Sequence, residues 1–573
     1  MTTTGNSYAS FLLGALNSSN VTEDSVVGTG ARYGNYSYWI QDNFKVSSRL
    51  MLNLGLRHDI FLPFKEVLDR ESFFNPNLPN SAAGGAPGIL MFMGNGPNSC
   101  KCRTNINTNY KNFGPRIGVA YTLNDKTVIR AGYTIMYTHR GAVGGRGGGR
   151  IGTGTLGYSA SPSFVSPEGY SPAFYWDNGV PSYAKPPFFE PTLGTTFNGT
   201  TSPAATMQYG DPIIGGRPPR YQNWNLGVQR ALTSTLSLSV NYVGSNGHFL
   251  GGGGRGFWSD QVHPRYLVLG NLLTMPANSA NLATARNILP SLPGLPYPNY
   301  SGTGATIGQM LRSFPQYTNV SDLWGDVANS NYNSLQLTAN KRLSHGLVFN
   351  LYYTYAKAMD DTAGTRTAYN WKTEKAPSTD AANVLNILWV YGLPFGKGHS
   401  LGSGNVVVEK LTSNWQLSGI TTYRSGQFLG TVGAACTLPP NAGSCYADYN
   451  PNFSGPIRIN GTYGSGDLLA TNAPAFLDRG AWMSPTAYSY GNTPRTGANG
   501  LRGPSNSNQS VALKRDFGIR EGWKISVQAD AFNVFNWVRF GNPNFNITSA
   551  NFGKITGTAN SPRVVQFNAR LTF

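Results

Sequence analysis

The sequence is poor in charged residues and contains no long hydrophobic run. Asp, Glu, Lys and Arg make up 12% of the 573 residues, about half of the ~25% that is usual in soluble domains. Mean hydropathy is nevertheless only −0.27, and no stretch approaches the ~18 consecutive apolar residues of a membrane-spanning helix. Few charges without hydrophobic runs indicate strands in which apolar and polar residues alternate.

Signatures of catalysis and metal binding are also missing. The six histidines are scattered and form no HExxH or paired ligand spacing. The four cysteines, Cys100, Cys102, Cys436 and Cys445, match no zinc pattern, so in an oxidising compartment local disulfides are the simpler interpretation. A Cys436–Cys445 bond is plausible, whereas a Cys100–Cys102 bond would close a very tight ring. We expect no enzyme, no metal site and no cofactor.

We expect no secretory signal peptide in the first residues of this sequence. Residues 1–10 carry no positive charge, and Phe11-Leu12-Leu13 is too short for the hydrophobic region of such a signal. An exported protein requires this signal, so an export-based interpretation predicts coding sequence upstream of Met1.

The last residues of the chain form the clearest strand pattern. One face carries Val565, Phe567, Ala569, Leu571 and Phe573, and the intervening residues Gln566, Asn568, Arg570 and Thr572 are polar. The length matches the ~9–11 residues of a tilted transmembrane strand. In lipid such a strand needs hydrogen-bonding partners on both sides, so we expect more strands of this kind.

About fourteen segments carry a similar pattern, of which the first is the weakest. They are Ser7–Leu16, Tyr36–Lys45, Leu50–Asp59, Pro115–Thr122, Thr127–Thr138, Gln222–Arg230, Thr235–Gly244, Asn333–Arg342, Leu347–Lys357, Val384–Leu393, Ser413–Arg424, Ser507–Asp516, Trp523–Val534 and Arg563–Phe573.

The connections between these segments alternate in length. One set is short: 46–49, 123–126, 231–234, 343–346, 394–412 and 517–522. The other set is longer: 62–114, 139–221, 245–332, 358–383, 425–506 and 537–562. Transmembrane barrels show short periplasmic turns and long extracellular loops, whereas a soluble sandwich has no reason to sort its loops in this way. The sequence therefore predicts an all-β fold, a transmembrane antiparallel β-barrel.

The basic excess does not indicate nucleic acid. The formal charge is +18, but Lys and Arg are scattered and form no dense cluster or basic helix. Basic loops that face outer-membrane lipid, lipopolysaccharide or an anionic ligand fit this distribution better.

Several stretches, in order along nearly the whole chain, resemble the C-terminal barrel of TonB-dependent outer-membrane receptors, in particular the Oar-like subgroup with a carboxypeptidase-regulatory-like domain. Among them are YWIQDNFKVSSRLMLNLGLRHD (38–59), NFGPRIGVAY (112–121), NYNSLQLTANKRLSHGLVFNLYYTYAKAMDD (331–361), NWQLSGITTYRSGQ (414–427) and FGKITGTANSPRVVQFNARLTF (552–573).

The resemblance implies a 22-stranded barrel in the outer membrane of a Gram-negative bacterium, closed by an N-terminal plug. The complete protein would load a ligand from outside and release it when an inner-membrane energy-coupling complex pulls on its N-terminal box. Residues 1–573 are expected to be a partial barrel, without that plug, the signal peptide and the first strands. The terminal strand with Phe567, Leu571 and Phe573 is expected to be recognised by the barrel-assembly machinery.

The candidate ligand contacts are aromatic and arginine residues in two long loops, because such side chains are enriched at recognition sites. They are Arg140, Arg146, Arg150, Tyr175, Trp176, Arg255, Trp258 and Trp324. They could equally pack the loops together or contact lipopolysaccharide. The ligand, an unknown small molecule, is not indicated by the sequence.

Three interpretations remain open at this point. The first is the barrel of a TonB-dependent receptor that binds and takes up a ligand. The second is a self-sufficient, porin-like passive channel of about fourteen strands. The third is a soluble, secreted all-β binding protein.

Overall fold

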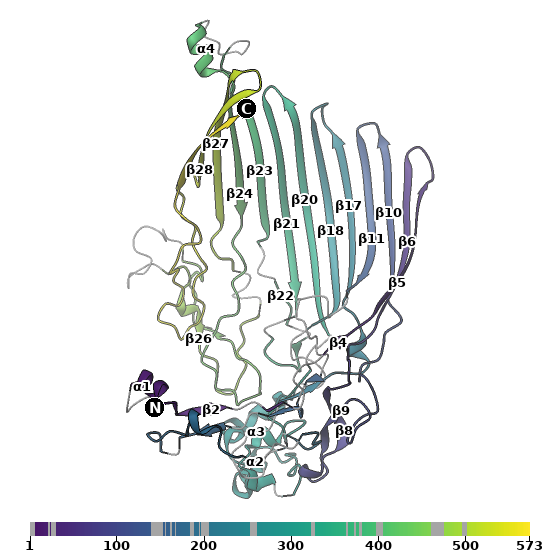
Figure 1. Ribbon diagram of the computed structural model, residues 1–573, viewed down its shortest axis with the longest axis vertical. Coiled ribbons are helices and arrows are strands. Elements are labelled where there is room, and N and C mark those ends of the chain that lie inside the picture. The colour runs from purple at the N-terminus through teal and green to yellow at the C-terminus, as the bar shows by residue number, and fades with distance from the viewer. Residues whose placement is uncertain are drawn as a thin grey trace.

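The computed structural model consists of one large, curved antiparallel sheet with a folded layer of loops at one end (Figure 1). The structure describes residues 6–573 except 21–22, 25–29, 139–152, 155, 161–162, 167, 184–187, 194, 196–205, 252–259, 299, 323–326, 363–364, 372–373, 378–380, 397–404, 460–474 and 496–500. Among the described residues, no helix is long and apolar enough to cross a membrane.

The strands of the large sheet pair with their neighbours along the chain, which makes a continuous meander. They are β5 (Asn35–Lys45), β6 (Leu50–Phe61), β10 (Phe113–Asn124), β11 (Thr127–Tyr137), β17 (Arg220–Ala231), β18 (Leu236–Leu250), β20 (Ala328–Ser344), β21 (Leu347–Asp360), β23 (Asn383–Gly392), β24 (Trp415–Arg424), β27 (Asn506–Arg520), β28 (Trp523–Phe532) and β29 (Val564–Thr572). The short β22 (Ala376–Pro377) pairs with β21 and completes a 14-stranded sheet. The predicted all-β antiparallel fold is confirmed, and every predicted strand except the first is present.

The first predicted strand, Ser7–Leu16, is wrong. Residues Ser7–Leu12 form the helix α1, which begins at Asn6, whose side chain accepts a hydrogen bond from the Tyr8 amide at 3.0 Å. The helix ends just before Gly14, which has a left-handed φ of 62°. Only β1 (Ala15–Leu16) is extended, and it pairs with β15 (Phe174–Tyr175) outside the large sheet. Phe11, Leu12 and Leu13 are consecutive, so this segment lacks the period of two that defines a strand with one apolar face.

The strand register gives the sheet one apolar and one polar face. Directly paired residues share a face, and one such row crosses six strands with Val228, Val240, Leu337, Tyr353, Leu385 and Tyr423. Their immediate sequence neighbours form a row on the opposite face with Gln229, Ser239, Thr338, Tyr352, Asn386 and Thr422. This arrangement suits a lipid-facing surface on one side and an aqueous lumen on the other.

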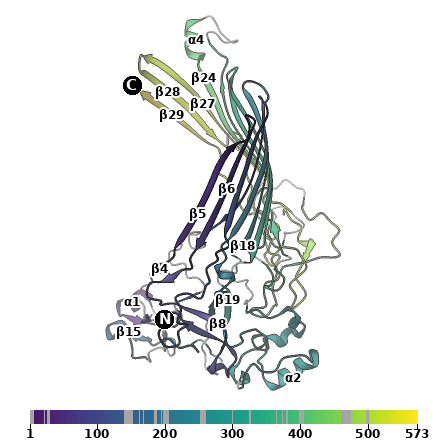
Figure 2. The ribbon, with the colours of Figure 1, turned by 90° about the vertical axis from the view of Figure 1, so that its right-hand side faces the viewer.

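The two outermost strands of the sheet have no partner on their outer side among the described strands. These are β5 and β29, and all eleven residues of β5 are exposed. Figure 2 shows β27, β28 and β29 turning away from the rest of the sheet. The predicted barrel is therefore an open sheet in this structure, with two edges whose backbone groups would need partners in lipid.

With one exception, the connections sort by length between the two ends of the sheet, as the sequence predicts. At the turn end they are 46–49, 125–126, 232–235, 345–346, 393–414 and 521–522. The turn between β20 and β21 has positive φ at His345 and Gly346 (52° and 77°), the geometry of a tight hairpin. Only the connection from β23 to β24 is longer, and it contains the helix α4 (Val406–Thr412).

At the opposite end, the described residues of the connections 62–112, 138–219, 251–327, 361–382, 425–505 and 533–563 form what we call the loop layer (Figure 1). Its helices are α2 (Ser279–Ile288), α3 (Ile307–Met310), η1 (Ser81–Ala83), η2 (Trp176–Asn178), η3 (Ile214–Gly216), η4 (Pro264–Thr274), η5 (Tyr300–Thr303) and η7 (Arg479–Ala481). Its strands are β7 (Lys65–Glu66), β8 (Ser72–Pro79), β9 (Pro87–Phe92), β12 (Thr153–Gly154), β13 (Ser159–Ala160), β14 (Ser163–Val165), β15, β16 (Thr206–Tyr209), β19 (Asn319–Asp322), β25 (Asp448–Tyr449) and β26 (Trp482–Met483).

The N-terminal segment is bound to this layer through short strand pairs. Besides β1, it contains β2 (Ser18–Asn20), β3 (Glu23–Asp24) and β4 (Ala31–Arg32). They pair with β14, β13 and β7 respectively. The chain therefore crosses the loop layer before it enters the large sheet at β5.

An arginine placed on the apolar face should destabilise the sheet in a bilayer far more than one on the polar face. Leu337 and Thr338 are adjacent in β20 but belong to opposite rows. We expect Leu337→Arg to lower the free energy of unfolding in lipid vesicles by about 2–4 kcal/mol, the usual cost at the bilayer midplane. Thr338→Arg, the matched control, should change it by less than about 1 kcal/mol. Urea titration monitored by electrophoretic heat-modifiability measures both, and equal losses would contradict the assignment of the faces.

Candidate ligand-binding loop layer

The loop layer has hydrophobic cores of its own, which distinguishes it from a set of independent loops. One core is formed mainly by the connection from β18 to β20 and includes Tyr266, Leu273, Leu282, Tyr300 and Ile307. A second lies in the connections after β24 and β28 and includes Leu429, Phe476, Leu477, Trp482 and Phe552. A third joins three connections through Phe74, Leu90, Tyr158, Met207 and Tyr317. Such buried contacts fix the relative positions of loops that are distant in sequence.

Tyr317 connects two of these loops by hydrogen bonds as well as by packing. Its side chain is fully buried, and its hydroxyl donates to the Gly88 carbonyl and accepts from Asn80 Nδ2, both at 2.9 Å. Asn80 Nδ2 also reaches the Gly88 carbonyl at 3.0 Å. Burial raises the pKa of Tyr317, so the hydroxyl stays protonated and keeps its donor role.

A buried ion pair holds the connection from β18 to β20 together. Arg312 Nη2 lies 2.8 Å from Asp260 Oδ2, and the two side chains are 1% and 0% exposed. Arg312 also donates to the carbonyls of Asp260 and Thr318, each at 2.7 Å. The Phe314 amide donates to Asp260 Oδ1 at 3.0 Å. Burial raises the pKa of Asp260 to about 6 against the opposing effect of Arg312. Since loss of one partner would leave a buried charge uncompensated, we assign this pair a structural role.

Glu66 joins the N-terminal segment to the loop layer by a hydrogen bond. Its fully buried carboxylate accepts hydrogen bonds from Arg70 Nη2 at 2.7 Å, the Leu68 amide at 2.7 Å and the Gly30 amide at 2.9 Å. The Gly30 bond crosses from β7 to the residue just before β4. The hydrogen bonds from Arg70 are the main reason why the pKa of Glu66 falls to about 2. The charged form is therefore the one that this site stabilises.

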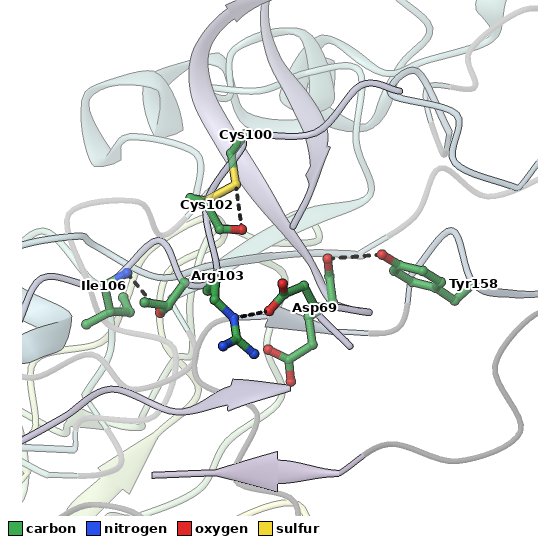
Figure 3. Close-up of a disulfide and its surroundings, with 8 residues drawn as sticks. Asp69, Cys100, Cys102, Arg103, Ile106 and Tyr158 are labelled. Carbon is green, nitrogen blue, oxygen red and sulfur yellow. Dashed lines mark hydrogen bonds and ion pairs between the residues drawn. A yellow bond between two sulfur atoms is a disulfide. The ribbon is translucent and has the colours of Figure 1, made fainter. Parts of the chain in front are cut away.

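The two cysteine pairs are both bonded, and both lie in the loop layer. Figure 3 shows the Cys100–Cys102 disulfide, whose Cα atoms are 5.1 Å apart, next to Arg103, which points to Asp69. Arg103 Nε and Asp69 Oδ1 are 2.7 Å apart. The Cys436–Cys445 disulfide, with a Cα distance of 5.6 Å, closes a small loop between β24 and β27.

Two of the predicted ligand contacts lie side by side on the surface of the layer. Tyr175 ends β15 and is 45% exposed, and Trp176 follows it and is 66% exposed. The Trp176 amide donates to the Gly14 carbonyl at 2.8 Å, which brings α1 and its exposed Phe11 close to this position. The predicted contacts Arg140, Arg146, Arg150, Arg255, Trp258 and Trp324 lie outside the described residues. The three residues of the terminal strand, Phe567, Leu571 and Phe573, are exposed at the sheet edge.

The sequence did not indicate the residues that organise the layer. Glu66, Asn80, Asp260, Arg312 and Tyr317 carry no local motif, and Asn80 and Tyr317 are 237 residues apart. Among the described residues, no group of three or more His, Cys, Asp or Glu side chains is placed to hold a metal ion.

The family of the chain follows from comparison with known proteins. The model of the outer membrane beta barrel domain matches residues 1–566. The chain belongs to this outer membrane beta barrel family. Its location is the outer membrane of a Gram-negative bacterium, and the apolar face of the sheet is the surface that faces lipid. No curated protein matches the chain.

Several solved structures of receptors and transporters are similar to this chain. The ferripyoverdine receptor of Pseudomonas aeruginosa, bound to ferripyoverdine, is 11% identical, with 95% of this chain and 39% of that chain covered and a TM-score of 0.39. The ferric preacinetobactin receptor BauA of Acinetobacter baumannii is 11% identical, with 95% and 43% covered and a TM-score of 0.38. The unliganded ferric citrate transporter FecA is 10% identical, with 95% and 46% covered and a TM-score of 0.35. The chain spans less than half the length of each.

Acid should loosen the loop layer around Glu66. The pKa of Glu66 is about 2 in the folded protein and 4.5 without these contacts. Its stabilisation is therefore complete above pH ~4.5 and is lost as the pH falls toward about 2. We expect the hydrogen-exchange protection factors of the Gly30, Leu68 and Arg70 amides to fall across this window.

A Glu66→Gln variant should show low protection already at pH 6 and no further change down to pH 2. Glu521→Gln, in the exposed turn between β27 and β28, is the control and should retain the normal profile. The role of Glu66 would be contradicted if these three amides had the same protection factors at pH 6 and at pH 2 in the unmodified chain.

Proposed function

We propose that this chain is the barrel part of an outer-membrane receptor of the TonB-dependent, Oar-like kind. In the complete protein it binds a small ligand at the loop layer and takes part in energy-coupled uptake across the outer membrane. The role is binding and transport rather than catalysis. The resemblance of stretches such as 38–59 and 331–361 supports the subgroup, and the membership of the barrel family supports the location.

The observation that carries this proposal is the packed loop layer. A passive channel needs a water-filled entrance, and extensive packing between loops does not help solutes to diffuse through it. Here five of the six connections at one end of the sheet contribute to three hydrophobic cores, and the layer presents exposed Tyr175 and Trp176. Rigidly supported loops with exposed aromatic residues suit ligand recognition, because less conformational entropy is lost on binding.

The open edges of the sheet support a larger complete barrel. Among the described strands, none pairs with the outer edges of β5 and β29, and unpaired backbone groups are costly in lipid. We propose that further strands of the complete receptor pair with them, and that its plug and coupling box provide the contact with the inner-membrane complex. The barrel-assembly machinery would act on β29, where the Phe567 and Phe573 side chains are 81% and 82% exposed.

A porin-like channel is the alternative function. The apolar and polar faces are compatible with it, since the polar row with Gln229, Thr338 and Asn386 would also line an open pore. Conductance of the purified chain in a planar lipid bilayer separates the two proposals. We expect either no current or only leaks of irregular size, because the two edges of this sheet lack partners in lipid. A steady, reproducible single-channel conductance would favour the porin-like channel and contradict the receptor.

The coding sequence upstream of Met1 provides an independent test. Translation in the same frame should yield a plug, a coupling box and additional alternating strands. An upstream sequence with a signal peptide alone would contradict the proposal that this sheet is part of an energy-coupled receptor.

A further inference from the structure

Three neighbouring strands at one side of the sheet form a notch on its polar face. β5, β6 and β10 lie side by side in the sheet (Figures 1 and 2). Trp39 pairs directly with Arg57, and Gln41 pairs with Gly55, which in turn pairs with Arg116. All five residues therefore lie on the same face, opposite to the lipid-facing row. They line a cavity of about 220 Å³.

The two arginines of this notch differ in their internal contacts. The Arg57 side chain is held by its own strand and by β5, because its Nε lies 2.8 Å from Asp59 Oδ1 and its Nη2 donates to Ser37 Oγ at 3.0 Å. Arg116 is exposed, and its side chain makes no hydrogen bond or ion pair within the described part of the chain. A guanidinium with free donors beside a second, fixed guanidinium is a strong attractor for an oxyanion.

Gly55 makes the space between these side chains. A Cβ added there would lie 3.6 Å from both Arg116 Cβ and Gln41 Cγ and 3.4 Å from the Ile40 carbonyl, which are ordinary contact distances. A larger side chain at this position is therefore compatible with the strand and would fill the notch. On the other side of the notch, Trp39 is 73% exposed and offers an apolar ring for stacking.

We propose that Trp39, Gly55, Arg57 and Arg116 form a binding site for a soluble anionic ligand that carries a carboxylate or phosphate on a flat apolar group. The anionic group pairs with Arg116 and with the unused donor of Arg57, and the flat group stacks on Trp39. This site deepens the proposed receptor function, on which its position in an aqueous lumen rests. It places one recognition element on the barrel wall rather than in the loop layer.

Fluorescein, a planar dianion at pH 8, is a suitable probe, and its fluorescence anisotropy reports binding to the detergent-solubilised chain. We expect Arg116→Gln to raise the dissociation constant by about tenfold or more, since a hydrogen bond between charged groups is lost. Gly55→Val should have a similar effect by filling the notch. Arg570→Gln, which removes an arginine from the same face at the far edge of the sheet, is the matched control and should change the constant by less than about twofold.

Each variant is compared at equal folded fraction, measured by heat-modifiable electrophoretic mobility. Arg116→Lys keeps the charge and should retain part of the affinity. Equal losses in Arg116→Gln and Arg570→Gln, or undiminished binding in Gly55→Val, would overturn the site. Inorganic phosphate should displace the probe. Displacement by purified lipopolysaccharide alone would assign the site to lipid headgroups and overturn the soluble ligand. The assay does not depend on transport, so it separates failure of this site from failure of the receptor proposal.

Discussion

The fold depends on one constraint: inside a bilayer, every backbone amide and carbonyl must find its partner in another strand. This requirement explains why the large sheet is a simple meander, in which each strand pairs with the one before it. It also explains the strict opposition of the two faces, because the residues that do not face lipid must tolerate water. The long connections can leave this pattern only outside the membrane, and there they build the loop layer.

The loop layer follows ordinary rules of soluble proteins. It buries Phe74, Phe476 and Tyr300 in compact cores, and it neutralises its buried charges in pairs such as Asp260 with Arg312. Two environments thus determine the structure of the chain: lipid surrounds the strands of the large sheet, and water surrounds the loop layer. In the proposed receptor, recognition takes place in the second region and on the polar face, where Trp176 and Arg116 are exposed.

The strands were predictable from sequence because their information is local. An alternation such as that around Leu337 and Thr338 fixes both the strand and its face within a few residues. The error at Ser7–Leu16 arose where consecutive apolar residues and the Asn6 cap favour a helix. The closure of the barrel was not predictable in this way, since it depends on what pairs with β5 and β29.

The contacts within the loop layer could not be predicted from the sequence, because they join residues that are distant along the chain. The contact between Asn80 and Tyr317 depends on how two distant connections meet, and neither residue has a local signal. The choice of Tyr175 and Trp176 as ligand contacts stays a prediction, and both side chains are exposed. The notch at Arg116 needed the register of three strands, since its members are separated by up to 77 positions in the sequence.

The orientation of the sheet in the bilayer is the claim on which the rest depends, and spin labelling tests it most directly. Single cysteines at each position from 335 to 340 in β20, labelled with a nitroxide in lipid vesicles, report contact with oxygen in lipid or with a water-soluble nickel complex. We predict a period of two, with positions 335, 337 and 339 accessible to oxygen and 336, 338 and 340 accessible to nickel. Uniform accessibility along the strand, or the opposite phase, would contradict it.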